Sequence, residues 1–580
     1  MTNPLDAKTV VWCDPGAVIA ASCPVCKTES LKPALLKTKS LVPSRGIITL
    51  LRCLECSNLF WNDVEVFAYE GGWLPWSTDF YVEQGAGVDA LIEPIARLPP
   101  DRVRAYLEIG CGYGFSIDAA ERLFGWRSVG VDPSPVAKAG RIGLGLDIRP
   151  IYATTDIDLG GPFDLVYASE VIEHVDKPEA FLAICAAHLA EDGVLTLSTP
   201  DAGLVRPDAP TAELVLALSP GLHLILYTAE GLRHLLRGAG FPHVEVDSRG
   251  HRLVAYASRR PIDFDTTAPL DRTLYQKYLK QVLDRDGLPS ALQRGARYRL
   301  LKEFTNAGDY NSARVLLKTL AAEIEGTFGI DIEAPLPQFV MEAMRSGPKT
   351  GRFGAPWSLP GILYCAGMIA QNGDGDPGAA VNWFDLAGTA ATRFRGAYSS
   401  IGIDDGETAS LEEDAPRQSL LSLCRVDPHL AVARLLNRSP PATAAELELI
   451  LITLTTLGRL EAAAILEAVV VGETGWRLLN ARGMLTLLHH RDAPRAAKFF
   501  ARAWAEAIEA YPPPQPSEWC RTKYNEVLAW ITAGDAPRAT AAAEELLAPE
   551  HGKWLTDETR TDLAILLSKH PQVWDLMKRD

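Results

Sequence analysis

The segment of this 580-residue chain that most restricts its fold is a short apolar run ending in three closely spaced glycines. Residues 105–109 read Ala-Tyr-Leu-Glu-Ile and lead into Gly110, Gly112 and Gly114. The apolar run predicts a buried strand, and the glycines allow the backbone to turn sharply into a helix expected over residues 115–124. Folds of this kind bind ligands at the carboxyl end of the strand, beside the helix N-terminus. The segment therefore predicts a ligand site.

The spacing of these glycines distinguishes between two classes of ligand. A dinucleotide fingerprint has the spacing Gly-x-Gly-x-x-Gly, but here Phe115 occupies the position of its third glycine. Glu108 precedes the first glycine, and a second strand-like run, residues 126–131, ends at Asp132. Acidic-x-Gly-x-Gly-x-Gly resembles the first motif of class I S-adenosylmethionine (SAM)-dependent methyltransferases.

Three later segments are similar to the same family and follow in its order, residues 163–175, 189–200 and 221–241. The resemblance implies a Rossmann-like α/β methyltransferase domain over residues 71–262 that binds SAM. In that family the glycines pass beside the methionine part of the cofactor, and the strand-end acid, here Glu108, is tied to its amino group.

Further residues are candidates for the rest of the cofactor. The resemblance places Asp132 against both ribose hydroxyls, although a nicotinamide enzyme would also have an acid there. Asp156 is the candidate acid for the adenine, with a loop aspartate that caps a turn as the alternative. Glu170 is expected to line the cofactor pocket, and with Glu173 it could also bind substrate hydroxyls.

The catalytic residues are less constrained by the sequence. Methyl transfer is an in-line displacement in which the protein aligns and desolvates the reactants, and a hydroxyl acceptor usually needs a general base. His174 follows the fourth strand and is the best base candidate. His223 and Tyr227 lie in a segment that could cap the acceptor site. The alternative for His174 is a structural histidine at a helix start that shapes the pocket, and for His223 and Tyr227 it is core packing in a lid.

Two cysteine pairs stand in the N-terminal 70 residues. Cys23 and Cys26, and then Cys53 and Cys56, form Cys-x2-Cys…Cys-x2-Cys, a pattern that places four thiolates around one Zn²⁺. Residues 46–51 are expected to form a strand that enters the second pair. We therefore expect a structural zinc ribbon over residues 1–70, with a redox Cys-x2-Cys pair as the main alternative.

Residues 263–580 are dominated by Ala, Leu, Arg and Glu at helical spacing, which predicts an all-α domain. Turns containing Gly or Asp recur before helices rich in small residues, near residues 308, 375, 458, 492 and 534. Some spacings approach a helix–turn–helix repeat, so the region resembles degenerate tetratricopeptide-type repeats. An irregular helical domain is the alternative. These helices are expected to bind a protein partner or present the substrate.

Composition excludes some functions. The formal net charge of −16 argues against a nucleic-acid partner, and neither a membrane span nor a secretory signal is found, so a cytoplasmic protein is expected. A ribbon before a methyltransferase domain resembles bacterial methyltransferases of polysaccharide biosynthesis, as does the segment 80–87, which could help to close the pocket. It also resembles ribosomal-RNA methyltransferases, but the acidic charge weighs against these.

The sequence thus predicts a multidomain enzyme with a zinc ribbon, an α/β Rossmann-like domain and a helical-repeat domain. We expect it to methylate a sugar or glycan hydroxyl, or another small metabolite. The alternatives are a protein or RNA methyltransferase docked through the repeats, and a non-enzymatic assembly protein with a vestigial methyltransferase fold.

Overall fold

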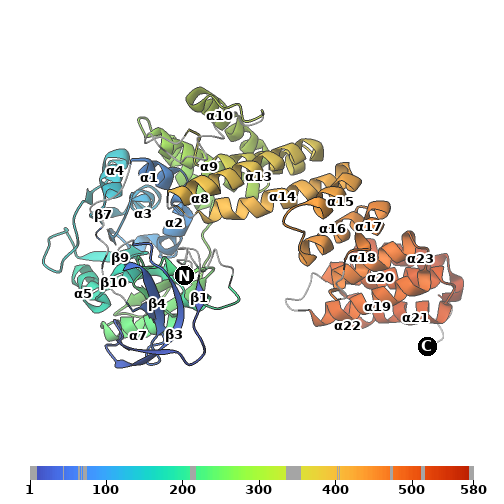
Figure 1. Cartoon of the computed structure of the whole chain (residues 1–580), viewed down its shortest axis with the longest axis horizontal. Helices are drawn as coiled ribbons and strands as arrows, with labels where there is room; N and C mark the ends of the chain where they lie inside the picture. The colour runs from blue at the N-terminus through green and yellow to red at the C-terminus, as the bar shows by residue number, and fades with distance from the viewer. Residues whose placement is uncertain are drawn as a thin grey trace, which may run out of the picture. The chain divides into compact units, whose positions relative to one another are not determined.

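The structure, a computed structural model, describes residues 10–573 with short gaps. The gaps are residues 43–44, 63–65, 67, 69–74, 210–213, 215–216, 335–353, 402, 404, 471–473 and 511–515. The chain forms two compact units, Met1–Cys365 with Thr389–Glu412, and Ala366–Gly388 with Glu413–Asp580. Figure 1 shows the course of the chain. The boundary expected at residue 263 falls inside the first unit, because the helices that follow it pack on the α/β region.

A seven-stranded sheet forms the centre of the first unit, in the order β12-β13-β10-β9-β6-β7-β8. Strands β6 to β10 are parallel, whereas β13 is antiparallel to both β10 and β12. All residues of β6 are buried, as expected for a parallel strand covered on both faces. The strands are β6 (Ala105–Ile109), β7 (Arg127–Val131), β8 (Ile148–Arg149), β9 (Phe163–Ser169), β10 (Leu189–Pro200), β12 (His243–Arg249) and β13 (Arg252–Ser258).

The chain crosses this sheet in a way that creates a binding crevice. From β6 it proceeds outward through β7 to β8, and then returns to β9 on the other side of β6. Such a reversal opens a crevice at the carboxyl ends of the central strands. The helical elements of this part are α1 (Pro75–Phe80), η2 (Tyr81–Gly85), α2 (Val88–Ala96), η3 (Pro100–Arg102), α3 (Phe115–Ala119), η4 (Ala120–Phe124), α4 (Pro135–Leu144), η5 (Ile172–His174), α5 (Pro178–His188), η6 (Ala202–Leu204) and α7 (Ala229–Gly238). The predicted strand–glycine–helix segment is confirmed, with its helix ending in the π-helical turn η4.

The cysteine-rich N-terminal segment forms a second sheet that is continuous with the α/β region. Its strands are β1 (Val11–Trp12), β2 (Val18–Ser22), β3 (Glu29–Lys39), β4 (Ile47–Arg52) and β5 (Leu59–Trp61), joined by β11 (Ile225–Leu226) from the α/β region. Ile225 pairs with Phe60, and Leu226 with Leu59. Cys23 and Phe60 belong to the same hydrophobic core as Phe181. The described part of this N-terminal segment is therefore built into the first unit.

Three helices beyond residue 263 belong entirely to the same unit, α8 (Arg272–Leu283), α9 (Ser290–Asn306) and α10 (Tyr310–Phe328). Three later helices, α12 (Leu359–Met368), α13 (Pro377–Ser400) and α14 (Gly406–Val426), are each divided between the two units. The Tyr278 hydroxyl of α8 donates to the Asp118 carboxylate at 3.1 Å, and the Arg285 guanidinium lies 3.2 Å from the same carboxylate. These contacts connect α8 to the helix that follows the glycine loop.

The second unit is helical, as predicted. Beyond α14 it contains α15 (Pro428–Asn437), α16 (Ala444–Thr456), α17 (Leu460–Glu467), α18 (Trp476–Leu488), α19 (Ala493–Glu509), α20 (Pro516–Thr532), α21 (Ala536–Leu547), α22 (Pro549–Gly552) and α23 (Asp557–Ser568), and η7 (Ile369–Gly373) precedes α13. Asp492 and Asp535 cap α19 and α21 by accepting bonds from backbone N–H groups, and a proline follows within the first helical turn. That the helices are tetratricopeptide-like stays a prediction.

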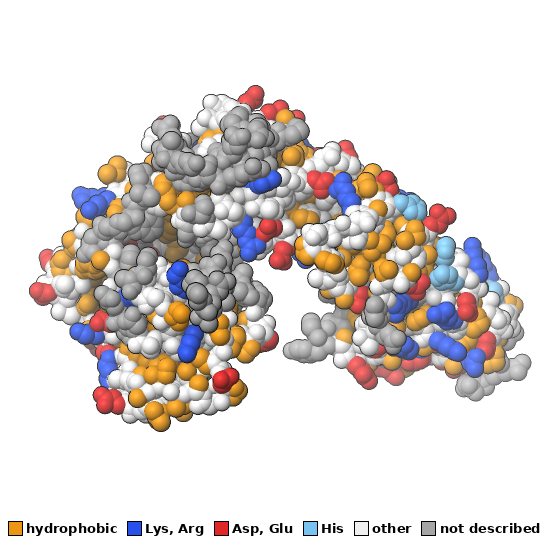
Figure 2. All heavy atoms as spheres, viewed as in Figure 1, with side chains coloured by type: hydrophobic (Ala, Val, Ile, Leu, Met, Phe, Trp, Pro, Cys, Tyr) orange, Lys and Arg blue, Asp and Glu red, His pale blue; other side chains and the backbone are white. Residues whose placement is uncertain are grey.

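The distribution of surface charge and the character of the helices can be compared with the sequence. On the face drawn in Figure 2, basic and acidic side chains are interspersed over the helical part of the chain. Among the described residues, no helix combines the length and the apolar character needed to cross a bilayer.

Candidate functional site

The glycine loop between β6 and α3 forms one wall of a cavity. Gly110, Gly112 and Gly114 have φ angles of 77°, 52° and 89°, a region in which other residues are strained. Gly110 also has no space for a side chain, because a Cβ there would stand 2.4 Å from Cγ2 of Val171. Gly110 and Gly112 line the cavity, whereas Gly114 packs beneath the loop against Leu146 and Ile148.

The cavity lies at the carboxyl ends of β6, β7 and β9 and has a volume of about 730 Å³. This size is within the range of small-molecule and cofactor sites. The cavity brings together most of the cofactor residues predicted from the sequence. Those that line it are Glu108, Gly110, Gly112, Asp132 and Glu170, together with the base candidate His174.

Glu108 is a buried carboxyl group at the base of the cavity. Only 2% of the residue is exposed, and burial raises the pKa of its carboxyl to about 8. The Ser116 hydroxyl donates to Oε2 and partly opposes this shift. A buried carboxyl group of this kind would bind a cationic ligand well, because an opposite charge favours its ionised form.

Asp132 is fixed at the end of β7 by the backbone around it. Its Oδ2 accepts a hydrogen bond from the N–H of Gly112 at 2.9 Å, and its Oδ1 accepts one from the N–H of Ser134 at 2.8 Å. Each carboxylate oxygen has a further lone pair. Asp132 therefore joins the glycine loop to the following turn and can still accept hydrogen bonds from a diol in the cavity.

Asp156 does not reach this cavity. It is exposed in a turn, where its carboxylate is hydrogen-bonded to the side chain of Thr154, and this bond lowers the pKa of Asp156. Tyr152 and Ala153 line the cavity instead. The structure thus corresponds to the alternative interpretation of Asp156, a loop aspartate that caps a turn.

Glu170 lines the cavity at the end of β9. It follows β9 with a φ of 55°, a conformation uncommon for a residue with a side chain, and it is exposed to the cavity. The hydroxyl of Ser198 on β10 donates to its Oε1 at 3.0 Å. Unusual backbone geometry of this kind tends to occur at functional sites.

His174, which is half-buried, and His223, which is buried, form an edge-to-face pair. Their ring centroids are 4.9 Å apart, but only His174 lines the cavity. Nδ1 of His174 lies 3.0 Å from the carbonyl oxygen of Leu222, and Nδ1 of His223 lies 2.9 Å from that of Ala217. A carbonyl oxygen only accepts, so each Nδ1 carries the proton and each Nε2 carries a lone pair. Burial lowers the pKa of His174 to about 4 and that of His223 to about 3, so both rings are neutral at pH 7.

Glu173 completes this group. It is fully buried, accepts a hydrogen bond from Thr199 at 3.0 Å, and has its Oε1 3.8 Å from Nε2 of His174. Ligand atoms of Glu173, His174 and His223 all lie within 4.8 Å of one another. Two imidazoles and a carboxylate could hold a divalent cation.

Tyr227 lies outside the cavity. It is fully buried beside β11, and its hydroxyl donates to the carbonyl oxygen of Ile172 at 3.3 Å. Burial raises the pKa of Tyr227 well above its ordinary value. Neither Tyr227 nor His223 meets the cavity, so of the three catalytic candidates only His174 does.

Further residues line the cavity. Lys177, His251 and Arg252 were not singled out in the sequence, and Tyr81 lines the cavity with them. Tyr81 belongs to the segment that was expected to help close the pocket. His251 lies in the turn before β13 and Arg252 is the first residue of that strand, and no motif marks either of them in the sequence.

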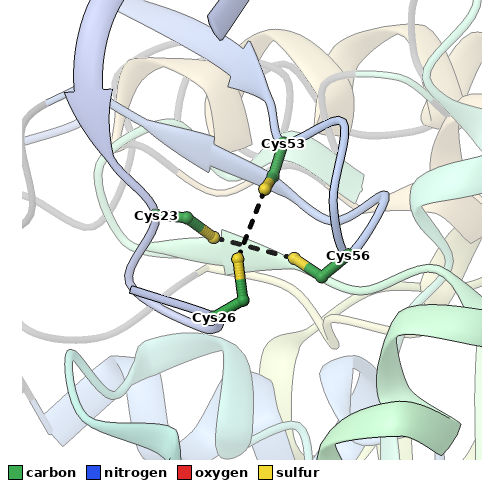
Figure 3. A group of neighbouring side chains, drawn as sticks. All are labelled: Cys23, Cys26, Cys53 and Cys56. Carbon is green, nitrogen blue, oxygen red and sulfur yellow. Dashed lines mark hydrogen bonds between the residues drawn. The ribbon is translucent and has the colours of Figure 1, made fainter. Parts of the chain in front are cut away.

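The four cysteines converge on one point in the N-terminal sheet (Figure 3). The Sγ atoms of Cys23 and Cys56 are 3.7 Å apart, and those of Cys26 and Cys53 are 3.5 Å apart. Four thiolates at the Zn–S distance of about 2.3 Å in a tetrahedron would be separated by about 3.8 Å. A disulfide would need about 2.05 Å. The spacing therefore fits a tetrahedral metal site.

The surroundings of the cysteines also fit a metal bound by thiolates. The chain turns through a positive φ directly after each pair, at Lys27 and Ser57. Lys32 is fully buried, and its ammonium lies 3.5 Å from Sγ of Cys53. The amide of Asn58 lies 3.6 Å from Sγ of Cys56. Buried donors directed at sulfur stabilise the negative charge that four thiolates leave around one Zn²⁺.

Comparisons with known proteins agree with the geometry of the cavity. The family model of a methyltransferase domain matches residues 81–246. The ubiquinone biosynthesis O-methyltransferase of Rhodopseudomonas palustris (strain TIE-1) is 39% identical over 99 residues, which are 16% of this chain and 38% of that protein. The protein of the same name from Bradyrhizobium diazoefficiens is 40% identical over 99 residues, with the same shares. The chain thus spans well under half of these relatives.

Among solved structures, a SAM-dependent methyltransferase of Thermotoga maritima is 20% identical to this chain. The superposition covers 32% of this chain and 94% of that one, with a TM-score of 0.26.

Proposed function

Because a methyltransferase-domain model matches residues 81–246, we propose that the protein transfers a methyl group from SAM to a hydroxyl of a sugar, a glycan or another small metabolite. The observation that carries this proposal is the continuous cavity that extends from Glu108 and Asp132 to Glu170 and His174. Glu108 and Asp132 present carboxylates that suit an ammonium group and a ribose. Glu170 and His174 present polar groups that suit an acceptor.

The residues present fit the cofactor. The carboxyl of Glu108 would bind the ammonium of the methionine part, which replaces the solvation that the buried carboxyl lacks. Asp132 would accept hydrogen bonds from the ribose hydroxyls. The loop at Gly110 and Gly112 would let the cofactor approach the backbone closely. When bound, SAM supplies the electrophilic methyl group, and the protein has to align the acceptor and remove its proton.

An oxygen acceptor is supported by two observations. Both curated relatives are named as O-methyltransferases. His174 is neutral at pH 7 and lines the cavity, so it can accept the proton that a hydroxyl loses. Glu170 would hold a neighbouring hydroxyl of the acceptor. The sugar and glycan class rests on the resemblance of the ribbon and methyltransferase arrangement to enzymes of polysaccharide biosynthesis.

The first experiment is isothermal titration of the purified protein with S-adenosylhomocysteine (SAH). We expect micromolar binding that Asp132→Ala abolishes and that Asp156→Ala leaves unchanged. Asp156→Ala is a matched control, because it removes an exposed carboxylate outside the cavity. Absence of SAH binding by the folded wild type, or equal effects of the two variants, would contradict the proposal.

The second experiment addresses the acceptor. Nucleotide sugars, free glycans and small phenols are incubated with SAM and the protein, and the products are analysed by mass spectrometry. The proposal expects the mass of one methylene group to be added, at oxygen, in one of these classes. If the methyl group is transferred only to a protein or to RNA, the small-molecule and glycan proposal is wrong and the acceptor is a macromolecule.

We also propose that Cys23, Cys26, Cys53 and Cys56 hold one structural Zn²⁺. Four thiolates leave no position for substrate, so the ion would stabilise the fold rather than take part in the chemistry. Elemental analysis of the purified chain should find one zinc per molecule, and Cys53→Ser should reduce this value.

A further inference from the structure

The segment that follows α1 covers the proposed cofactor site. Tyr81 lines the cavity, and its hydroxyl lies 3.2 Å from the position that a Cβ on Gly112 would occupy. Gly85 and Ala86 line the same cavity. The segment forms a single π-helical turn, Tyr81–Gly85, a form that is common at functional sites. A turn this short depends on its neighbours to keep it in place.

A side chain of helix α9 binds the backbone of this turn. The guanidinium of Arg299 donates to the carbonyl oxygens of Val82 at 2.9 Å and Ala86 at 3.0 Å. The approach is close, because a Cβ on Gly295 would stand 2.6 Å from the carbonyl oxygen of Val82. One arginine thus bridges both ends of the turn.

A buried ion pair anchors the middle of the turn to the same helix. Glu83 is fully buried, and the guanidinium of Arg294 lies 2.8 Å from its Oε2. Its Oε1 accepts hydrogen bonds from the N–H of Ser358 at 3.1 Å and from the hydroxyl of Ser358 at 3.0 Å. A buried carboxylate is strongly destabilising when it loses its partners. The positions of Arg294 and Ser358 therefore determine the position of the turn that carries Glu83.

A third contact continues the attachment. The amide of Gln84 donates to Glu407 at 2.8 Å, and Glu407 also accepts from Lys302 of α9 at 2.7 Å. All of these residues belong to the first compact unit. The turn over the cavity is thus held by side chains that come from beyond residue 290.

We propose that Arg294 and Arg299 are positioning residues for the cofactor. They act through the turn 81–86, which they hold over the cavity in its binding conformation. The inference rests on the proposed function, since it concerns the same site. It assigns the first helices beyond the α/β sheet to the methyltransferase itself, where the sequence suggested only a partner-binding or substrate-presenting domain.

Arg299→Met is the informative variant, because it removes the two hydrogen bonds to the turn without leaving a buried carboxylate unpaired. Arg297→Met is its matched control, on the same helix and similarly half-buried, but bonded to Glu323 and Gln293 instead. Arg299→Lys keeps the charge and one donor group. SAH affinity is measured by titration, and ordering of the turn by hydrogen exchange of its amides.

We expect Arg299→Met to bind SAH about tenfold more weakly, as if the turn were in place a tenth of the time. Arg299→Lys should recover part of this loss, and Arg297→Met should bind like the wild type. Exchange across residues 81–86 should be faster only in the Arg299 variants. A merely structural arginine would lower the unfolding temperature and leave the affinity of the folded protein unchanged.

Two results would overturn the inference. The first is wild-type affinity in Arg299→Met, and the second is an equal loss of affinity in Arg297→Met. If Arg299→Met does not fold, Arg299→Lys provides the test, and wild-type affinity and exchange in that variant would refute it. If the wild type itself binds no SAH, the proposed function fails and the cofactor role of these arginines fails with it. The exchange data would then still report whether Arg299 orders the turn.

Discussion

The buried carboxyl group of Glu108 predicts a pH dependence of cofactor binding. Burial raises the pKa of this group to about 8, from an ordinary value of 4.5, so it is mostly protonated in the ligand-free protein at pH 7. The ammonium of SAM or SAH favours the ionised form, so binding at neutral pH should release a proton. Affinity should therefore increase with pH up to about 8 and then level off.

The size of the effect follows from the ionised fraction. With a pKa of about 8, that fraction increases about 25-fold between pH 6.5 and pH 8.5, and the SAH association constant should increase by the same factor. Glu108→Gln cannot ionise, so its affinity should be weaker than that of the wild type at pH 8.5 and independent of pH over this range.

The same group should influence the stability of the ligand-free protein. Its folded-state pKa lies above the unfolded value, so its contribution to stability is fully present below about pH 4.5 and is lost as the pH rises through 8. The full shift corresponds to about 5 kcal/mol. Ligand-free Glu108→Gln should therefore gain stability relative to the wild type between pH 5 and pH 8.5.

Titration calorimetry in two buffers of different ionisation enthalpy measures both the affinity and the protons released. Thermal unfolding of the two ligand-free proteins at pH 5 and pH 8.5 tests the stability effect. An SAH affinity that is independent of pH in the wild type, with no proton released at pH 7, would refute the assignment of Glu108 to the ammonium group.

Three further predictions concern His174, Gly110 and the proposed zinc site. His174→Asn, whose amide can keep the hydrogen bond to Leu222, should lower the methyl-transfer rate by about 10²- to 10⁴-fold with SAH binding retained, and rate and titration measurements would separate the two. Gly110→Ala should destabilise the protein by about 1–3 kcal/mol in denaturant unfolding, and Val171→Ala should restore part of the loss, because the added Cβ meets that side chain. Removal of zinc by a chelator should lower the unfolding temperature, and scanning calorimetry with and without added Zn²⁺ would show whether the loss is reversed.

Local motifs could be predicted from the sequence because their chemistry depends on spacing. The glycine loop with Glu108 is defined by consecutive residues, and Asp132 by the end of the next strand, and the structure places these residues in one cavity. The cysteine pairs were predictable for the same reason. Fixed spacing within each pair allows both sulfurs to reach one point.

Features that depend on distant contacts could not be predicted in this way. The strand β11 is two residues long and acquires its strand geometry from β5, which lies more than 160 residues away. Arg294 and Arg299 look like ordinary charged residues of a helix, and only the packing of α9 brings them to the turn at residues 81–86. His223 stands in a segment expected to cap the acceptor site, yet the hydrogen bond from its Nδ1 to Ala217 holds it behind His174.

Lys32 provides a last test that distinguishes a metal centre from a simple cluster of thiols. Zn²⁺ with four thiolates has a net charge of −2, and the buried Lys32 ammonium lies 3.5 Å from one of the sulfurs. Removing such a neighbour of the ligands costs about 10- to 100-fold in metal affinity. Lys32→Met should therefore lose zinc to a chromogenic chelator at a correspondingly lower chelator concentration. Lys37→Met is the matched control, because Lys37 is exposed on the same strand. Equal zinc retention by Lys32→Met and the control would show that the buried ammonium does not compensate a metal–thiolate charge, whereas a loss confined to Lys32→Met would tie its burial to the metal.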